Sequence, residues 1–115
     1  MTKEKWLTPE IVEVLNKAAD PERTKDILKF AVQEMDRLQI HPTNLQLTVL
    51  TNHLGEMIRR AQTGERLAPV DKTVFASVSA PALQIARDIA CRIGGLDDSE
   101  AYILSVHFEN AKANK

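Results

Sequence analysis

The sequence contains few aromatic residues. Phe, Trp and Tyr together make up 4% of its 115 residues, whereas apolar residues make up 43%. Most of the apolar residues are Ala, Leu, Ile and Val, which suit packing between helices better than the faces of a β-sandwich. The composition therefore favours an all-α protein.

The sequence also has only one cysteine, so it cannot form an internal disulfide. This residue, Cys91, falls beside Ala90 and near Ile93 in a segment with helical spacing of apolar residues. A free cysteine in such a position usually behaves as a small apolar side chain. We expect Cys91 to be buried and unreactive.

An excess of positive charge is absent as well. Fifteen basic and sixteen acidic residues leave a formal net charge of −1. Proteins that bind nucleic acid directly usually carry a basic face that neutralises phosphates, so a direct contact with nucleic acid is not expected. The apolar runs are short, and the N-terminus lacks the apolar core of a signal peptide. We therefore expect a cytoplasmic protein without a membrane segment.

Helix start and stop signals divide the chain into five amphipathic segments, which we assign to a single domain over residues 1–115. Each start combines a capping side chain with a proline, or with a Gln or Glu three residues later. The first predicted helix begins near Thr8. The next three run from Pro21 to Gln39, from Thr43 to Gly64 and from Ser79 to Gly94, and the fifth runs from Asp97 through Ala111. A short turn is expected after Asp71. The pattern predicts a compact five-helix bundle.

Two of these helices carry a histidine at the edge of their apolar stripe. On the third helix, His53 and Arg60 fall on the same flank, within about 20° of each other in helical projection. On the last helix, His107 has a similar position relative to its own stripe, and Glu100 lies two turns before it. These four residues are the candidate functional residues.

Several kinds of chemistry remain open for them. His53, His107 and Glu100 could supply three metal ligands, but none of the usual ligand spacings is present, and His41 has no partner that the sequence identifies. No nucleophile elbow or phosphate-binding glycine loop occurs, so we expect neither an enzyme nor a cofactor.

Phosphorylation of an imidazole requires only a partly exposed ring and a group that responds to the new charge. A phosphoryl group on His53 or His107 would attract Arg60 and repel Glu100. The alternative is that all four residues are structural. In that case the histidines and Arg60 are packed amphipathic side chains, and Glu100 is a capping-box acid.

The two histidine segments resemble the motifs of the phosphotransferase-system regulation domain, PRD. The first motif of that family is approximately Leu-x-x-His-Ile with an arginine seven residues after the histidine, and it is matched by residues 50–54 and Arg60. The second is approximately Asp-Glu-x-x-Tyr-Ile-x-x-His-Phe, and Glu100, Ile103, His107 and Phe108 match it. The resemblance extends from about residue 24 to the end of the chain.

This resemblance implies a five-helix bundle that pairs as a homodimer, with His53 and His107 as phosphoryl acceptors. The donors would be the histidine-containing phosphocarrier protein or a sugar-specific carrier subunit. Family members usually carry two such modules and a nucleic-acid-binding domain, whereas this sequence has one module, so the output would come from a separate regulator protein. The alternative function is a constitutive helical interaction module with structural histidines.

Overall fold

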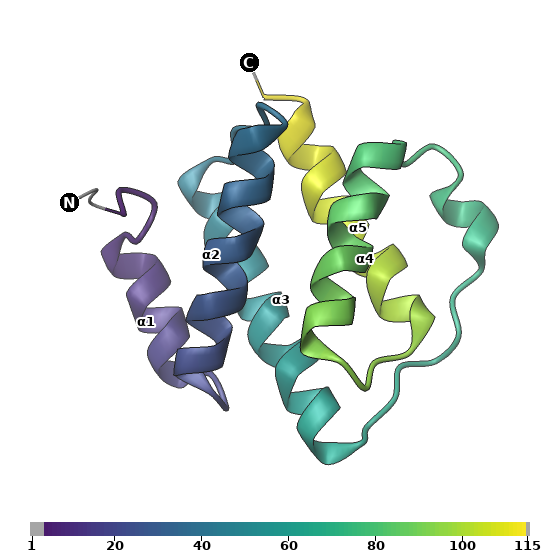
Figure 1. The fold of residues 1–115 in the computed structure, drawn as a ribbon, viewed down its shortest axis with the longest axis horizontal. Helices are drawn as coiled ribbons and strands as arrows, with labels where there is room; N and C mark the ends of the chain where they lie inside the picture. Colours follow the sequence, from purple (N-terminus) through teal and green to yellow (C-terminus); the bar gives the residue numbers. More distant parts are fainter. Residues whose placement is uncertain (1–3, 115) are drawn as a thin grey trace.

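A computed structural model describes residues 4–114, which fold into five α-helices and one short 3₁₀ helix (Figure 1). The elements are α1 (Pro9–Lys17), α2 (Pro21–Arg37), α3 (Asn44–Thr63), η1 (Lys72–Phe75), α4 (Ala80–Ile93) and α5 (Asp98–Lys112). The all-α class and the five-helix bundle predicted from the sequence are confirmed.

The five helix starts are confirmed by their capping contacts. The side chain of Thr43 accepts a hydrogen bond from the backbone of Gln46, and the side chain of Gln46 accepts one from the backbone of Thr43. This reciprocal pair is a capping box. Side chains before the other four helices each accept a backbone N–H of the first turn; they are Thr8, Asp20, Ser79 and Asp97.

The second helix ends earlier than predicted. It stops at Arg37, two residues before Gln39, whose φ is +59°. The backbone N–H of Gln39 bonds to the carbonyl of Asp36, and that of Ile40 bonds to the carbonyl of Met35. This pattern is a Schellman motif, which reverses the chain at a left-handed residue. As a result Ile40 turns back and is buried in the core.

Helix α3 is the central element of the bundle. It contacts each of the other four α-helices, with α1 and α2 on one side and α4 and α5 on the other (Figure 1). Its residues Leu54, Met57 and Ile58 are fully buried, and Phe108 of α5 is buried in the same apolar cluster. The flanks of α3 are therefore held in fixed positions against α5.

The prediction for Cys91 was wrong, because this residue is exposed. The buried face of α4 includes Ile85, Ile89 and Ile93. Cys91 lies two residues from both Ile89 and Ile93, which at about 100° per residue places it on the opposite side of the helix. Its apolar neighbours in the sequence therefore do not cover it.

The connection between α3 and α4 passes along the start of α5. The backbone N–H of Val70 bonds to the hydroxyl of Ser99, and the ring of Phe75 packs against that of Tyr102. Asp71 caps the short helix η1, as the sequence predicted. Within the described residues, no helix combines the length and the apolar character needed to cross a membrane.

Gly55 lies where the end of α1 approaches α3. A Cβ atom built at this glycine would lie 3.2 Å from the Cβ of Ala18, which is closer than an ordinary carbon–carbon contact. The Gly55→Val variant is expected to lose about 2 kcal/mol of unfolding free energy, because overpacking displaces the facing helix. Urea denaturation would measure the loss.

An Ala18→Gly substitution provides the matched control for this contact. In the Gly55→Val background it should recover part of the lost stability, because it removes the opposing Cβ atom. An unchanged denaturation midpoint for Gly55→Val alone would contradict the close approach of α1 to α3.

Candidate functional site

Helix α3 runs antiparallel to α5, and three polar side-chain contacts join α3 to α5 and to Asn114, which lies two residues beyond the end of α5. The contacts join Gln46 to Asn114, His53 to His107 and Arg60 to Glu100. Successive contacts are seven residues apart on both helices, which corresponds to two turns, or about 10 Å. We call this row of contacts the α3–α5 seam. All four candidate residues lie in it.

The two histidines lie in direct contact at the middle of the seam. The Nδ1 atom of His53 is 2.7 Å from the Nε2 atom of His107. The ring centroids are 4.9 Å apart, and the ring planes meet at 68°. A hydrogen bond at this distance has one N–H donor and one nitrogen lone pair as acceptor. The histidine pair is therefore joined through a single proton.

Both rings are partly buried and neutral at pH 7. Burial is the main cause that lowers the pKa of His53 to about 4, and repulsion from His107, when that ring is protonated, and from Arg60 adds to it. Glu56, one turn further along α3, acts weakly in the opposite direction. Burial also lowers the pKa of His107. Neutral imidazoles have a nitrogen lone pair, which a nucleophile requires.

The outward nitrogens of the pair reach the solvent. Among the described residues, every buried side-chain nitrogen and oxygen has a hydrogen-bond partner. The Nε2 atom of His53 and the Nδ1 atom of His107 form no hydrogen bond with the described part of the chain, so neither of them is buried. Each ring of the pair therefore keeps one nitrogen in contact with solvent.

Arg60 and Glu100 form a buried bidentate ion pair. The Nε atom of Arg60 is 2.7 Å from Oε2 of Glu100, and its Nη2 atom is 2.8 Å from Oε1. The side chains are 11% and 1% exposed, respectively. The alternative in which Glu100 is a capping-box acid was wrong, because its carboxylate bonds Arg60 and forms no capping box with Asp97.

A shallow hollow lies beside the histidine pair. It has a volume of about 270 Å³ and is lined by Leu45, Gln46, Val49, Val106, His107 and Asn110. Three of these residues are large apolar side chains with high exposure: Leu45 is 72% exposed, Val49 49% and Val106 38%. We call these three residues the apolar patch. Sequence reasoning missed it, although Leu45 and Val49 have the four-residue spacing of one helix face.

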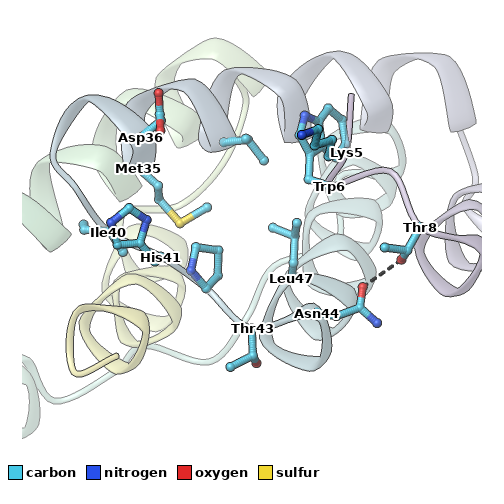
Figure 2. A pocket seen from close by; sticks show the side chains of 12 residues that line it. Lys5, Trp6, Thr8, Met35, Asp36, Ile40, His41, Thr43, Asn44 and Leu47 are labelled. Atoms are coloured by element: carbon cyan, nitrogen blue, oxygen red, sulfur yellow. Dashed lines mark hydrogen bonds between the residues drawn. The ribbon is translucent and has the colours of Figure 1, made fainter. Parts of the chain in front are cut away.

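The third histidine, His41, lies at a different place. It lines a hollow of about 340 Å³ beside the start of α3, together with Trp6, Met35 and Leu47 (Figure 2). Neither His53 nor His107 contributes to this hollow. His41 is therefore a suitable control residue for experiments on the pair.

The residues proposed as metal ligands do not converge. Glu100 is paired with Arg60 two turns away from His107 on α5. Within residues 4–114, no group of three or more His, Cys, Asp or Glu side chains is arranged to hold a metal ion. The geometry brings together two histidines and one ion pair.

A crystal structure of a PRD-containing transcription regulator from Lactobacillus casei is similar to this chain. The TM-score is 0.88 and the sequence identity is 38%. The similarity covers 91% of this chain and 94% of the other protein. No profile of a known protein family matches the chain, and no curated protein matches it. The shared structure includes nearly the whole bundle.

Proposed function

Because this chain belongs to the family of PRD-containing transcription regulators, we propose that it is a regulatory module with His53 and His107 as phosphoryl acceptors. The donor is the histidine-containing phosphocarrier protein or a sugar-specific carrier subunit of the phosphotransferase system. The observation that carries the proposal is the direct contact between the two histidines. Each belongs to a different sequence motif, and His53 Nδ1 lies 2.7 Å from His107 Nε2. The proposal implies a cytoplasmic protein.

The state of the pair supports a role in phosphoryl transfer. Both imidazoles are neutral at pH 7, and the outward nitrogens reach solvent. A phosphocarrier protein transfers its group to a nucleophilic nitrogen, so these are the properties that an acceptor needs. Neither property requires a metal or a cofactor.

The ion pair supplies an element that responds to the new charge. A phosphoryl group adds about −1.5 to −2 charge. Arg60 donates two hydrogen bonds to Glu100, and a phosphoryl group on the neighbouring pair would compete with this carboxylate for the guanidinium. Two alternative partners for one guanidinium give the seam two arrangements.

The apolar patch is the proposed contact surface for a second copy of the chain or for a separate regulator protein. It shares its hollow with His107, so a phosphoryl group on the pair would place charge at the edge of the contact. A coupling of about 1 to 3 kcal/mol would change the affinity for a partner by one to two orders of magnitude. The proposed output is thus a change in dimerisation or in partner binding.

One observation favours the alternative of a constitutive interaction module. Arg60 and Glu100 are fully paired in the absence of any phosphoryl group, which is also the arrangement expected of purely structural residues. In that case the apolar patch would bind its partner with the same affinity whether or not a donor is present. The two functions therefore differ in their response to phosphorylation.

Intact mass measurement tests the proposal. The chain is incubated with phosphoenolpyruvate, the first enzyme of the phosphotransferase system and the carrier protein. We expect an acid-labile phosphoryl adduct, which is lost or strongly reduced in His53→Ala or His107→Ala. The matched control His41→Ala should retain the full adduct, because His41 lies outside the pair.

The absence of an adduct would contradict phosphorylation by this carrier, provided that the carrier itself is phosphorylated in the same reaction. A sugar-specific carrier subunit should then be supplied in a second reaction. If neither donor gives an adduct, the result contradicts the proposed phosphoryl acceptors and supports the alternative of a constitutive interaction module. An adduct that only His41→Ala removes would contradict the assignment of the acceptors.

A further inference from the structure

The hydrogen bond between the two histidines links their chemical states. If His53 Nδ1 carries the shared proton, the lone pair of His53 lies on its outward Nε2, while His107 accepts the bond and has its own proton on the outward Nδ1. If His107 Nε2 carries the proton, the situation is reversed. In either neutral state only one outward nitrogen has a lone pair.

We propose that His53 and His107 form one acceptor site, in which one imidazole attacks the donor, the other takes the released proton, and the chain carries a single phosphoryl group. This inference rests on the proposed function and adds to it a role for the second histidine. The histidines of the two family motifs then take part in one and the same reaction.

The outward lone pair of the attacking histidine forms a bond to the phosphorus of the donor phosphohistidine, and the donor's P–N bond breaks with its electron pair going to the donor nitrogen. The ring of the attacking histidine becomes cationic, so its inward N–H is acidic. That proton crosses the 2.7 Å contact to the lone pair of the partner imidazole.

The phosphorylated pair cannot readily accept a second phosphoryl group. The partner imidazole now carries protons on both nitrogens, so it has no lone pair with which to attack another donor. Its positive charge also stabilises the phosphoryl group beside it. A second phosphoryl group would have to replace this attraction with repulsion between two anions on rings whose centroids are 4.9 Å apart.

The groups around the pair leave the partner imidazole as the proton acceptor. Glu56 and Arg60 are the charged residues whose fields act on His53. Arg60 is already paired with Glu100, and Glu56 with Arg59. Since both carboxylates are bound to arginines, the inward lone pair of the second histidine is the base in direct contact with the inward proton.

The first test is the number of phosphoryl groups per chain at saturation. The wild-type chain is incubated with excess phosphorylated carrier until the intact mass no longer changes. A final mass increase of one phosphoryl group agrees with a single site. An increase of two groups would overturn this inference and leave the proposed function intact, whereas no increase would contradict both.

The second test separates a proton acceptor from a structural neighbour. His53→Gln and His107→Gln retain a hydrogen-bonding side chain, but glutamine cannot accept the proton. For each variant that still becomes phosphorylated, the rate of phosphorylation should be at least tenfold lower than that of the wild type. Raising the pH should restore part of this rate. A wild-type rate and an unchanged pH profile in such a variant would overturn the proton transfer. His41→Gln is the control and should keep the wild-type rate.

Discussion

Glu100→Ala is expected to lower the free energy of unfolding by about 3–5 kcal/mol, because it leaves the guanidinium of Arg60 buried without its carboxylate. Glu100 is 1% exposed and Arg60 11%, so water does not replace the two lost hydrogen bonds. Urea denaturation followed by circular dichroism measures the change. Arg60→Ala should be similarly harmful, since it leaves Glu100 unpaired.

A surface ion pair of the same chemistry provides the control. Arg59 and Glu65 are 2.7 Å apart, but their side chains are 38% and 54% exposed. Glu65→Ala should therefore cost less than about 1 kcal/mol. A double replacement of Arg60 by Met and Glu100 by Leu should recover much of the stability, because it removes both buried charges. Equal small losses for Glu100→Ala and Glu65→Ala would contradict the buried pair.

The second large effect is a loss of stability in mild acid. The pKa of His53 is about 4 in the folded chain and near 6.5 in the unfolded chain, so the unfolded state binds the proton more tightly. The contribution of His53 is complete above pH 6.5 and is lost as the pH falls toward 4. Between pH 7.5 and pH 5 the expected loss is about 2 kcal/mol.

The loss of stability through His53 occurs at a higher pH than the loss through the carboxylates. Asp97 and Glu109 also have lowered pKa values, but their ordinary values are 3.8 and 4.5, so their contributions fade at lower pH. Denaturant unfolding at pH 7.5 and pH 5 measures the loss. A chain with both His53→Gln and His107→Gln should show a much smaller difference between the two pH values. A wild-type chain equally stable at both would contradict the buried neutral pair.

The sequence predicted the fold well because the relevant signals are local. Caps such as Thr43 with Gln46, and prolines at the first turn, act within a few residues of the helix ends that they define. The end of α2 was placed two residues too late, because the sequence around Gln39 contains no glycine to mark the left-handed turn. Cys91 was misplaced because its apolar neighbours in the sequence lie on another side of α4.

The site was only partly predictable from the sequence. Helical projection placed His53 and Arg60 on one flank of α3, but it could not show which residue of α5 each would face. That pairing depends on the antiparallel register of α3 and α5, which results from packing of the whole bundle. For the same reason the sequence left a capping role open for Glu100, although this residue is the partner of Arg60. The apolar patch likewise combines residues of two helices.

The most direct test of the histidine pair is nuclear magnetic resonance of the imidazole nitrogens in ¹⁵N-labelled protein. Spectra are recorded before and after addition of the phosphorylated carrier. We predict that His53 and His107 are neutral and share one proton at pH 7, and that both sets of signals change on phosphorylation, while those of His41 stay unchanged. Signals of His53 and His107 that remain unchanged in the presence of a competent donor would contradict the account.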